Sequence, residues 1–406
     1  MKVEHVRDYV VERLPYALNP RSIAVVGASR YTTKVGYKVI EGLKNWGYQG
    51  KIYPVNPRTS MMHGMKAYPR VCDIPDEVDL VFIAVPAHIV KSVLEDCVKK
   101  EAKIVVIATS AFKEIGRGEL QNELTQYCRD HKLPLIGPNL VGMGSPYLNF
   151  NCGFIPYLPK KGPVAMISQS GANLLAALGT SQKDHFGMSF FVGLGNKADV
   201  DFCEFIAYAD KDEHTKCVSV YIEGLDSPEA FVEACRAVNK PIVAIKVGGS
   251  KIGVKAAFAH TASENPNADS FYDEIFQEAG AIRATTWQQF LDISLALGMQ
   301  PPLKGDNIVM ITNGGGSGLL SCDHFERCGL PLHELAEISP NLAQRIRAYM
   351  PMFGSPLNPV DISGTATPIQ YKGAFTQAMR DPNVDGILGS ICPPAVTDVD
   401  AVVDVV

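Results

Sequence analysis

Residues 241–263 read PIVAIKVGGSKIGVKAAFAHTAS, and the interpretation of the whole chain starts from this stretch. It begins with the largely apolar run Pro241–Val247, which is typical of a strand covered on both faces of a sheet. The Gly/Lys-rich segment Gly248–Lys255 leads to one histidine, His260, between small neighbours. A sterically open imidazole can attack a phosphoryl group and pass it on, and loop glycines permit the movement. The alternative is that His260 only caps or packs beside the start of a helix.

The composition is that of a globular protein with an ample core. Of the 406 residues, 46% are hydrophobic and 20% are charged, and the net charge is −5. This charge gives no general attraction to nucleic acid or to anionic lipid, so we expect no polynucleotide partner. No apolar run reaches the roughly 18 to 20 residues of a membrane span, and the N-terminal residues lack a signal-peptide core. The sequence therefore predicts a soluble protein without a membrane partner.

The ten cysteines are spread along the chain, and they form no CxxC pair. This spacing favours the reducing cytoplasm and argues against a disulfide framework or a zinc site. We therefore expect no metal bound by these residues. The chain ends within the run AVVDVV, residues 401–406, so we expect it to be a fragment or a processed piece.

One plan occurs three times in the chain: an apolar strand, a Gly/Ser turn and an amphipathic helix. The strands are Ser22–Val26, Pro163–Ile167 and Asn307–Ile311. Strands that alternate with helices require parallel sheets covered on both faces. The sequence therefore predicts an α/β fold of three consecutive Rossmann/flavodoxin-like domains with mainly parallel sheets. Clusters of Pro, Gly and Lys set the boundaries at 1–155 for the first domain, 156–302 for a domain carrying the histidine loop and 303–406 for a third, possibly truncated domain.

The first domain carries candidate residues for coenzyme A at the carboxyl ends of its strands, where α/β sheets bind ligands. Its first turn, GASRYTTKVG at 27–36, is not the GxGxxG of dinucleotide enzymes. The second strand ends without the acidic residue that holds the ribose of NAD, and Arg58 supplies a cation that suits a phosphorylated ribose instead. Coenzyme A therefore fits better than NAD. The alternative is that these residues are only turn formers. The candidates are Gly27, Ala28, Ser29, Arg30, Asn56, Pro57, Arg58, Val85, Pro86, Ser110, Ala111, Phe112 and Asn139.

The second domain carries a candidate phosphate site and a candidate orienting carboxylate. Ser168, Gln169, Ser170 and Gly171 precede a predicted helix, whose free N–H groups suit an anion such as a phosphorylated histidine. The alternative is an ordinary N-cap serine. Glu223 follows a strand at the same sheet edge, where a carboxylate fixes the tautomer of an imidazole, unless it is only a solvated charge.

The residues of two further loops do not decide the function of these loops. The segment VGLGNKADVD, 192–201, is predicted to be a loop and a helix start in which Asn and Asp side chains cap. The segment TNGGGSG, 312–318, has four glycines, which favour close approach of something to the backbone. Its spacing does not decide between a nucleotide phosphate, a partner chain and the histidine loop.

The chain carries, in order, the motifs SIAVVGAS, YPVNP, VPA, IGPN, ISQSGA, GLGNKADVD, YIEG, AIKVGGS, AHTAS, TNGGGSG and NPVD. With these motifs it resembles, over essentially its full length, the NDP-forming acyl-CoA synthetases. This group contains ADP-forming acetyl-CoA synthetase and, more distantly, the α subunit of succinyl-CoA synthetase. GNKADVD together with the histidine loop is the most specific part of the resemblance.

The resemblance implies an acid–thiol ligase that interconverts a carboxylic acid, CoA and ATP with acyl-CoA, ADP and phosphate. The reaction would pass through an acyl phosphate and a phosphohistidine on a mobile loop. His260 looks like the phosphorylated residue, Glu223 like the carboxylate that steadies it, and Ser168 and Ser170 begin the helix that receives it. Six candidates fall where the family binds CoA, namely Gly27, Ser29, Arg58, Pro86, Ser110 and Asn139.

The resemblance also implies a partner and shows two departures. The ATP-grasp portion of the family, which binds ATP/ADP and Mg²⁺, is not visible in these residues, so we expect it on a β subunit or a further domain. A hetero-oligomer or a homodimer is then expected.

The family more often has HTG where this chain has His260-Thr261-Ala262, and Ser317 is also atypical; neither departure removes a reacting atom.

Three other functions compete with the ligase. One is the CoA-binding regulatory part of a protein acetyltransferase, which typically lacks the working histidine that is present here. A second is a non-catalytic CoA-binding module, and a more distant third is an NAD dehydrogenase. The acyl group, the choice between ADP and GDP and the physiological direction are left open by the sequence.

Overall fold

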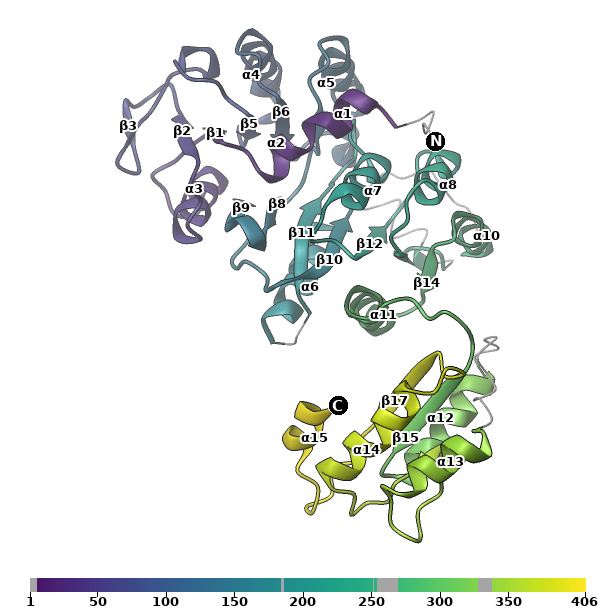
Figure 1. Cartoon of the computed structure of the whole chain (residues 1–406). Coiled ribbons are helices and arrows are strands. Elements are labelled where there is room, and N and C mark those ends of the chain that lie inside the picture. The colour runs from purple at the N-terminus through teal and green to yellow at the C-terminus, as the bar shows by residue number, and fades with distance from the viewer. Residues whose placement is uncertain (1–5, 184–185, 251, 254–268, 328–337) are drawn as a thin grey trace. The chain divides into compact units, whose positions relative to one another are not determined.

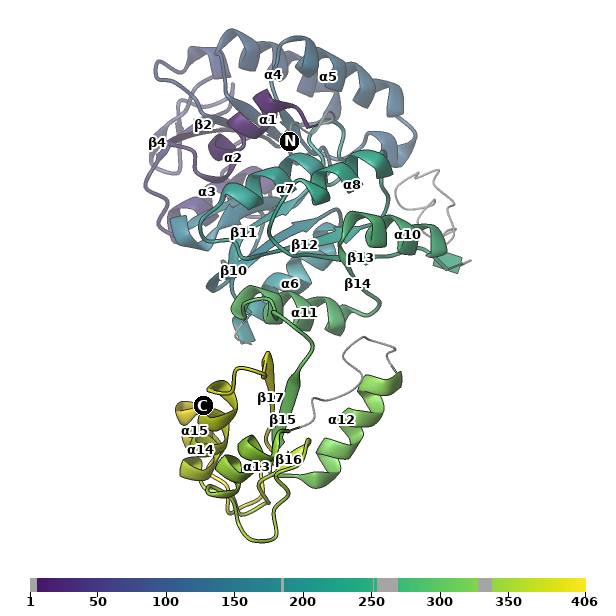
Figure 2. The ribbon, with the colours of Figure 1, turned by 45° about the vertical axis from the view of Figure 1, so that its right-hand side comes forward.

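The computed structural model describes residues 6–183, 186–250, 252–253, 269–327 and 338–406. It divides into two compact units, residues 1–300 and 301–406 (Figure 1). The first unit contains two large sheets with helices on their faces, which Figure 2 shows from a second side, and a small two-stranded one. The second unit contains a separate sheet of its own.

The first sheet of the first unit has the order β2-β1-β5-β6-β7, and all its pairings are parallel. Its strands alternate their side chains between two cores, since Ile23 and Val25 pack with α1, α2 and α3 while Ala24 and Val26 pack with α4 and α5. The strands are β1 (Ser22–Val26), β2 (Lys51–Val55), β5 (Leu80–Ile83), β6 (Ile104–Ile107) and β7 (Leu135–Ile136), and β3 (Met61–Met62) and β4 (Met65–Lys66) form a small hairpin. The helices are α1 (Asp8–Arg13), α2 (Pro15–Leu18), α3 (Val35–Asn45), α4 (Ala87–Lys99) and α5 (Gly118–Asp130), with 3-10 turns η1 (Val71–Asp73) and η2 (Lys113–Ile115).

The second sheet of the first unit has the order β14-β13-β12-β10-β11-β8-β9. Five of these strands pair in parallel, and β8 and β9 add an antiparallel ribbon beside β11. One face packs against α7, α8 and α10, and the other against α6 and α11. The strands are β8 (Gly142–Ser145), β9 (Phe150–Gly153), β10 (Lys161–Ser168), β11 (Met188–Gly193), β12 (Cys217–Ile222), β13 (Ile242–Lys246) and β14 (Ile282–Ala284). The helices are α6 (Gly171–Lys183), α7 (Phe202–Lys211), α8 (Pro228–Arg236), α10 (Asp269–Ala279) and α11 (Trp287–Met299), with the 3-10 turn η3 (Pro146–Leu148).

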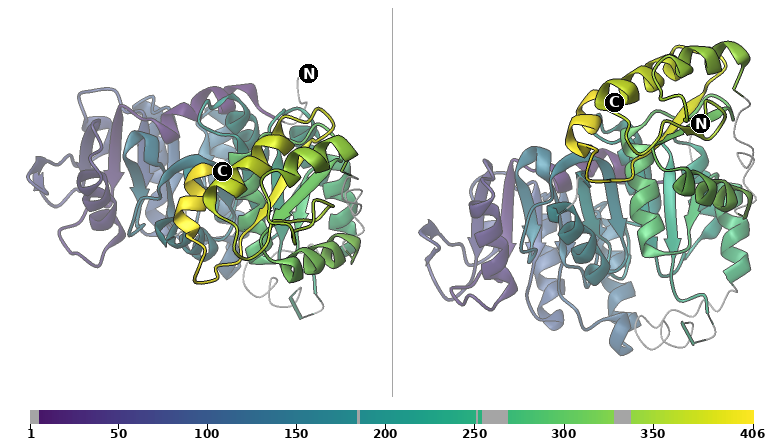
Figure 3. Two further views of the ribbon diagram at one scale, coloured as in Figure 1. Left: turned by 60° about the horizontal axis from the view of Figure 1, so that its bottom comes forward. Right: turned by 90° about the horizontal axis from the view of Figure 1, so that it is seen from below.

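The second unit is built on the parallel sheet β16-β15-β17, whose ribbon can be followed in the two views of Figure 3. Its core is formed by the strands and by helices α13 and α14. The strands are β15 (Ile308–Thr312), β16 (Val360–Asp361) and β17 (Gly386–Ser390), and the helices are α12 (Gly315–Arg327), α13 (Pro340–Arg347), α14 (Pro368–Met379) and α15 (Val399–Val405).

The predicted α/β class with mainly parallel sheets is confirmed by these pairings. The predicted strand Ser22–Val26 agrees with β1 at both ends, Pro163–Ile167 lies within β10, and Asn307–Ile311 is shifted by one residue from β15. These runs are largely apolar and mostly buried, as expected of strands covered on both faces. The ribbon β8–β9 pairs with the second sheet although it precedes the predicted boundary at residue 155, and the three domain boundaries themselves stay a prediction.

The two sheets of the first unit are joined by the carboxylate of Asp199, whose side chain is fully buried. Its Oδ1 accepts hydrogen bonds from Nη1 of Arg7 and, at 2.8 Å, from Nε of Arg129 on α5. Its Oδ2 accepts the backbone N–H of Leu135, where β7 begins, at 3.1 Å. Asp199 lies in the loop after β11 of the second sheet, so one carboxylate links the two sheets and the segment before α1.

Replacing Asp199 should destabilise the first unit strongly. In Asp199→Ala, two guanidinium groups lose their shared acceptor and a buried N–H loses its partner, so we expect a loss of about 3 kcal/mol in the free energy of unfolding. The control is Lys91→Ala, which removes an exposed ion pair with Glu123 and should cost less than about 1 kcal/mol. Urea denaturation measures both values, and equal losses in the two variants would contradict the role of Asp199.

Candidate functional site

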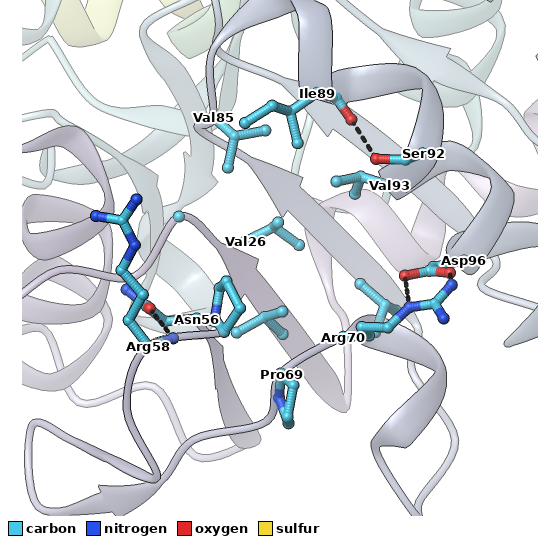
Figure 4. A pocket seen from close by; sticks show the side chains of 14 residues that line it. Val26, Asn56, Arg58, Pro69, Arg70, Val85, Ile89, Ser92, Val93 and Asp96 are labelled. Carbon is cyan, nitrogen blue, oxygen red and sulfur yellow. Dashed lines mark hydrogen bonds and ion pairs between the residues drawn. The ribbon is translucent and has the colours of Figure 1, made fainter.

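The first cavity has a volume of about 440 Å³ and lies at the carboxyl ends of β1, β2 and β5 (Figure 4). Five of the candidate CoA residues line it, namely Gly27, Asn56, Pro57, Arg58 and Val85. The cavity also has a guanidinium from Arg70, which is paired with Asp96 with 2.9 Å between Nε and Oδ2. Among the described residues, the guanidinium of Arg58 has no such partner, so Arg58 is the cation of this cavity that is available to an anion.

The turn after β1 is shaped by two glycines in close contact. Gly27 has φ +89°, and a Cβ on it would lie 2.4 Å from the carbonyl oxygen of Ala84. A Cβ on Gly36, near the start of α3, would lie 2.1 Å from the carbonyl oxygen of Gly27. The side-chain amide of Asn56 donates to the carbonyl of Ala28 at 2.8 Å and ties this turn to the end of β2. The helix therefore begins directly against the turn, which is the arrangement that presents backbone N–H groups to a phosphate.

A second cavity of about 450 Å³ lies at the carboxyl ends of β5 and β6 and shares Val85 with the first. Its lining includes three more candidates, Pro86, Ser110 and Ala111. The two cavities thus lie next to each other along the strand ends of the first sheet. Together they suit a molecule with an anionic head and a narrow arm.

The remaining CoA candidates lie outside both linings. Ala28 and Phe112 are buried in the two cores of the first sheet, so their side chains do not face a cavity. Ser29 and the exposed Arg30 lie in the turn after Gly27, where the hydroxyl of Ser29 accepts the N–H of Tyr31 at 3.1 Å. Asn139 has φ +64° and donates its backbone N–H to Thr109 at 2.9 Å, beside the second cavity.

The phosphate-site candidates and Glu223 lie together at one edge of the second sheet. Strands β10 and β12 are neighbours, and Oε1 of Gln169 accepts the N–H groups of Glu223 and Gly224 at 3.0 and 3.1 Å. The hydroxyl of Ser168 donates to the carbonyl of Ser170 at 2.8 Å. Gly171 begins α6, and a Cβ there would lie 2.5 Å from Cγ1 of Val141. The sequence placed these residues at one sheet edge, and Gln169 is the side chain that joins them.

Ser170 combines capping with a polar contact to the next strand. Its hydroxyl oxygen accepts the backbone N–H of Asn173 at 3.4 Å and the side-chain amide of Asn173 at 3.1 Å. The same amide donates to the hydroxyl of Tyr221 at 2.8 Å. Burial raises the pKa of Tyr221 to about 12, so this hydroxyl stays neutral. The N-cap geometry is thus present, and it is the same geometry that an anion site requires.

His260 lies outside the described residues. The strand that precedes it in sequence, β13, is the neighbour of β12, and the N–H of Val247 donates to Ile222 at 3.0 Å. Burial lowers the pKa of Lys246 at the end of β13, and its ammonium lies 4.5 Å from the centre of the Tyr272 ring.

The described part of the chain contains no group of three or more His, Cys, Asp or Glu arranged to hold a metal ion, and no helix in it is long and apolar enough to cross a membrane.

Sequence reasoning missed the role of the loop 194–201. It treated the Asn and Asp side chains there as caps, and this holds for Asp201, which forms a capping box with Glu204 at the start of α7. Asn196 and Asp199 instead bind the first sheet: the N–H of Asn196 donates to Pro138 at 2.9 Å. The high density of polar residues in this short loop was the available signal of a further role. The spacing of residues within a segment does not predict its contacts with distant segments.

Three family models match the chain: a CoA binding domain at residues 21–145, a succinyl-CoA ligase like flavodoxin domain at 161–297 and a Ligase-CoA domain at 308–404. The α subunit of ADP-forming acetate–CoA ligase I from Pyrococcus furiosus is 38% identical over 388 residues, which are 94% of this chain and 83% of that subunit. The chain belongs to the ADP-forming acyl-CoA synthetase family.

Solved structures of the family agree with this fold. An acetyl-coenzyme A synthetase 1 from Candidatus Korarchaeum cryptofilum, solved in complex with phosphate and ADP, matches with a TM-score of 0.91 and 35% identity over 97% of this chain and 85% of that one. Other family members are longer single chains. The ADP-forming acetate–CoA ligase of Methanocaldococcus jannaschii is 38% identical, and the match covers 89% of this chain but only 50% of that protein.

The turn after β1 should keep its conformation only if residue 36 is glycine, because Gly36 lies in close contact with Gly27. Gly36→Ala places a methyl group against a backbone carbonyl, so we expect a loss of about 1–3 kcal/mol in the free energy of unfolding, or a displaced turn that weakens CoA binding. Gly118→Ala, in α5, has open space around the new methyl group and should leave stability unchanged or raise it by up to about 1 kcal/mol. Thermal unfolding with and without CoA tests both, and an unaffected Gly36→Ala protein would refute the expectation.

Proposed function

We propose that this chain is the part of an ADP-forming acyl-CoA synthetase that binds CoA and carries the phosphohistidine. One observation carries the proposal: Gln169, in the turn before α6, holds the backbone N–H of Glu223, which directly follows β12, the neighbour of the strand that precedes His260. A phosphate-accepting helix start and an orienting carboxylate are the two groups that a phosphohistidine needs. The relatives named ADP-forming acetate–CoA ligases support the same activity.

The proposed reaction has three steps and is reversible. A phosphate oxygen attacks the thioester carbonyl of acyl-CoA, the C–S bond breaks, and CoA leaves as a thiolate from an acyl phosphate. A ring nitrogen of His260 then attacks phosphorus, the bond between phosphorus and the acyl oxygen breaks, and the carboxylate leaves. The phosphoryl group finally passes to ADP and forms ATP, which frees the imidazole.

Each residue of the second-sheet edge has a proposed task in these steps. Glu223 accepts the N–H of one ring nitrogen of His260, so that the other nitrogen is the nucleophile. The N–H groups at the start of α6, with the hydroxyls of Ser168 and Ser170, face the oxygens of the phosphoryl group. A mixed anhydride is hydrolysed readily, so the carrier histidine allows the acyl phosphate and the nucleotide to occupy separate, closed sites.

Coenzyme A is proposed to lie along the two cavities of the first sheet. Its phosphorylated ribose would meet the guanidinium of Arg58, and the pyrophosphate would face the turn that begins at Gly27. The pantetheine arm would pass Val85, which both cavities share, and reach Ser110 and Ala111. This path leads the thiol along the strand ends of the first sheet.

ATP or ADP and Mg²⁺ are proposed to bind an ATP-grasp β subunit or domain that works with this chain. Two relatives from Pyrococcus furiosus are named α subunits, which supports a second subunit. A hetero-oligomer or a homodimer, three domains at 1–155, 156–302 and 303–406, and a location in the cytoplasm complete the proposal. The small carboxylic acid that is the acyl substrate is not specified by it.

The acetyltransferase and the non-catalytic CoA module are less favoured alternatives. Both account for CoA binding, but neither requires a phosphate-accepting helix start beside an orienting carboxylate. The Pyrococcus furiosus and Methanocaldococcus jannaschii relatives are both named as ligases, and the matched family models include ligase domains in addition to the CoA binding domain.

Labelling with radioactive phosphate tests the ligase directly. Incubation of the chain and its ATP-grasp partner with γ-labelled ATP should place an acid-labile, base-stable label on the chain, and His260→Asn should abolish it. Glu223→Gln should slow labelling by about 10²-fold or more, because the imidazole loses its orienting acceptor. The control is His214→Asn, which replaces a partly exposed histidine that stacks on Tyr147 and should label normally. A wild-type chain that stays unlabelled with an active partner would exclude the proposal.

The role of Arg58 can be tested with two forms of the cofactor. Arg58→Ala should weaken the binding of CoA about tenfold or more, because a charge-assisted hydrogen bond to the ribose phosphate is lost. Its affinity for dephospho-CoA, which lacks that phosphate, should equal that of the wild type. Isothermal titration calorimetry measures both affinities. The matched control is Arg380→Ala, which removes the same charge from an exposed position in the second unit and should leave both unchanged. Equal losses for the two cofactor forms in Arg58→Ala would contradict the assignment.

A further inference from the structure

The side chains of Glu114 and Asn196 join the two sheets beside the second cavity. Glu114 lies in η2, which follows β6 of the first sheet, and Asn196 lies in the loop after β11 of the second sheet. The amide Nδ2 of Asn196 donates to Oε2 of Glu114 at 2.7 Å and to Oε1 of Gln121 at 3.0 Å. The other carboxylate oxygen of Glu114, Oε1, accepts the backbone N–H of Ala111 at 2.5 Å. Glu114 therefore connects Asn196 to the cavity wall.

Ala111 needs this support because of its backbone conformation. It has φ +82°, in the left-handed region that residues with a Cβ rarely adopt. Ala111 and its neighbour Ser110 line the second cavity. A strained residue persists only where its surroundings hold it, and the carboxylate of Glu114 is the group that binds its N–H.

Asn196 also holds the second loop beside this cavity. Its backbone N–H donates to the carbonyl of Pro138 at 2.9 Å, and its Oδ1 accepts from Nδ2 of Asn139 at 3.2 Å. Asn139 in turn donates its N–H to Thr109, which lines the cavity. One residue of the loop after β11 thus orients two loops of the first sheet.

The same loop is bonded to the phosphate-site turn. The N–H of Leu194, two residues before Asn196, donates to the carbonyl of Ser168 at 2.8 Å. Hydrogen bonds therefore link Ser168 to Leu194 and link Asn196 through Glu114 to Ala111, and the backbone of the loop joins Leu194 to Asn196. Burial acts to raise the pKa of Glu114, but the hydrogen bonds from Asn196 and from nearby backbone N–H groups outweigh it and lower the pKa, so the carboxylate is charged near neutral pH.

We infer that Glu114 and Asn196 are positioning residues that set the CoA-side loops against the phosphate-accepting edge, so that the thiol end of CoA is held in register with the phosphate. The inference rests on the proposed function, because it takes CoA as the ligand of the second cavity. Neither residue touches the reacting atoms. Their task is to keep Ser110, Ala111 and Asn139 in the conformation that CoA binds.

A pair of exchanged side chains tests this inference. In Glu114→Gln an amide replaces the carboxylate and faces the donor of Asn196, and in Asn196→Asp two carboxylates face each other. Each single variant should bind CoA about tenfold more weakly, the size expected for one hydrogen bond to a charged group. The double variant Glu114→Gln/Asn196→Asp again pairs an amide donor with a carboxylate acceptor, leaves an oxygen for the N–H of Ala111, and should recover CoA affinity to within about threefold.

The measurement is calorimetric titration of the 406-residue chain with CoA, with urea unfolding of each variant beside it. Gln126→Glu is the matched control, because it alters an exposed amide–carboxylate hydrogen bond to Asp130 on α5 and should leave CoA affinity unchanged. Single variants that bind CoA like the wild type, or a double variant that is no better than the singles, would overturn the inference while leaving the proposed function intact. A wild-type chain that does not bind CoA would remove the proposed function as well.

Discussion

The buried carboxylate of Asp199 is the interaction on which the arrangement of the first unit depends. It receives hydrogen bonds from Arg7, Arg129 and the N–H of Leu135, which belong to three separate segments of the chain. A carboxylate with no exposure to water is costly unless its oxygens are fully bonded, and these donors meet that requirement only when both sheets are in place. The geometry that satisfies this charge is therefore also the geometry that brings the two sheet edges together.

The loop that carries Asp199 makes three further contacts within a few residues. Leu194 binds the turn at Ser168, Asn196 binds the loops beside the second cavity, and Asp201 caps α7. Because the loop is short, these contacts constrain one another. A chemistry that transfers a phosphoryl group between a thioester site and a histidine requires such fixed distances, since a small displacement of reacting groups is costly in rate.

Much of the fold could be predicted from local pattern. Apolar runs such as Ser22–Val26 and Pro163–Ile167, followed by Gly/Ser turns, indicated parallel strands because a strand buried on both faces has to be largely apolar. The strand ends then identified Gly27, Arg58 and Val85 as lining residues, since ligands of such sheets bind at carboxyl ends. Phe112 shows the limit of this reasoning, because a residue in the loop after a strand can equally be buried in the core, and Phe112 is.

By itself the sequence determined the class of fold, the order of its elements, the candidate site residues and, through its motifs, the family. Only the tertiary structure decided that Gln169 bonds to the backbone of Glu223, that Asn196 and Glu114 meet across 82 residues of chain, and that β8 and β9 join the second sheet. The physical reason is that strands and turns follow from the periodicity of neighbouring residues, whereas hydrogen bonds between distant segments depend on how completed sheets pack. The spacing of residues along the chain does not predict that packing.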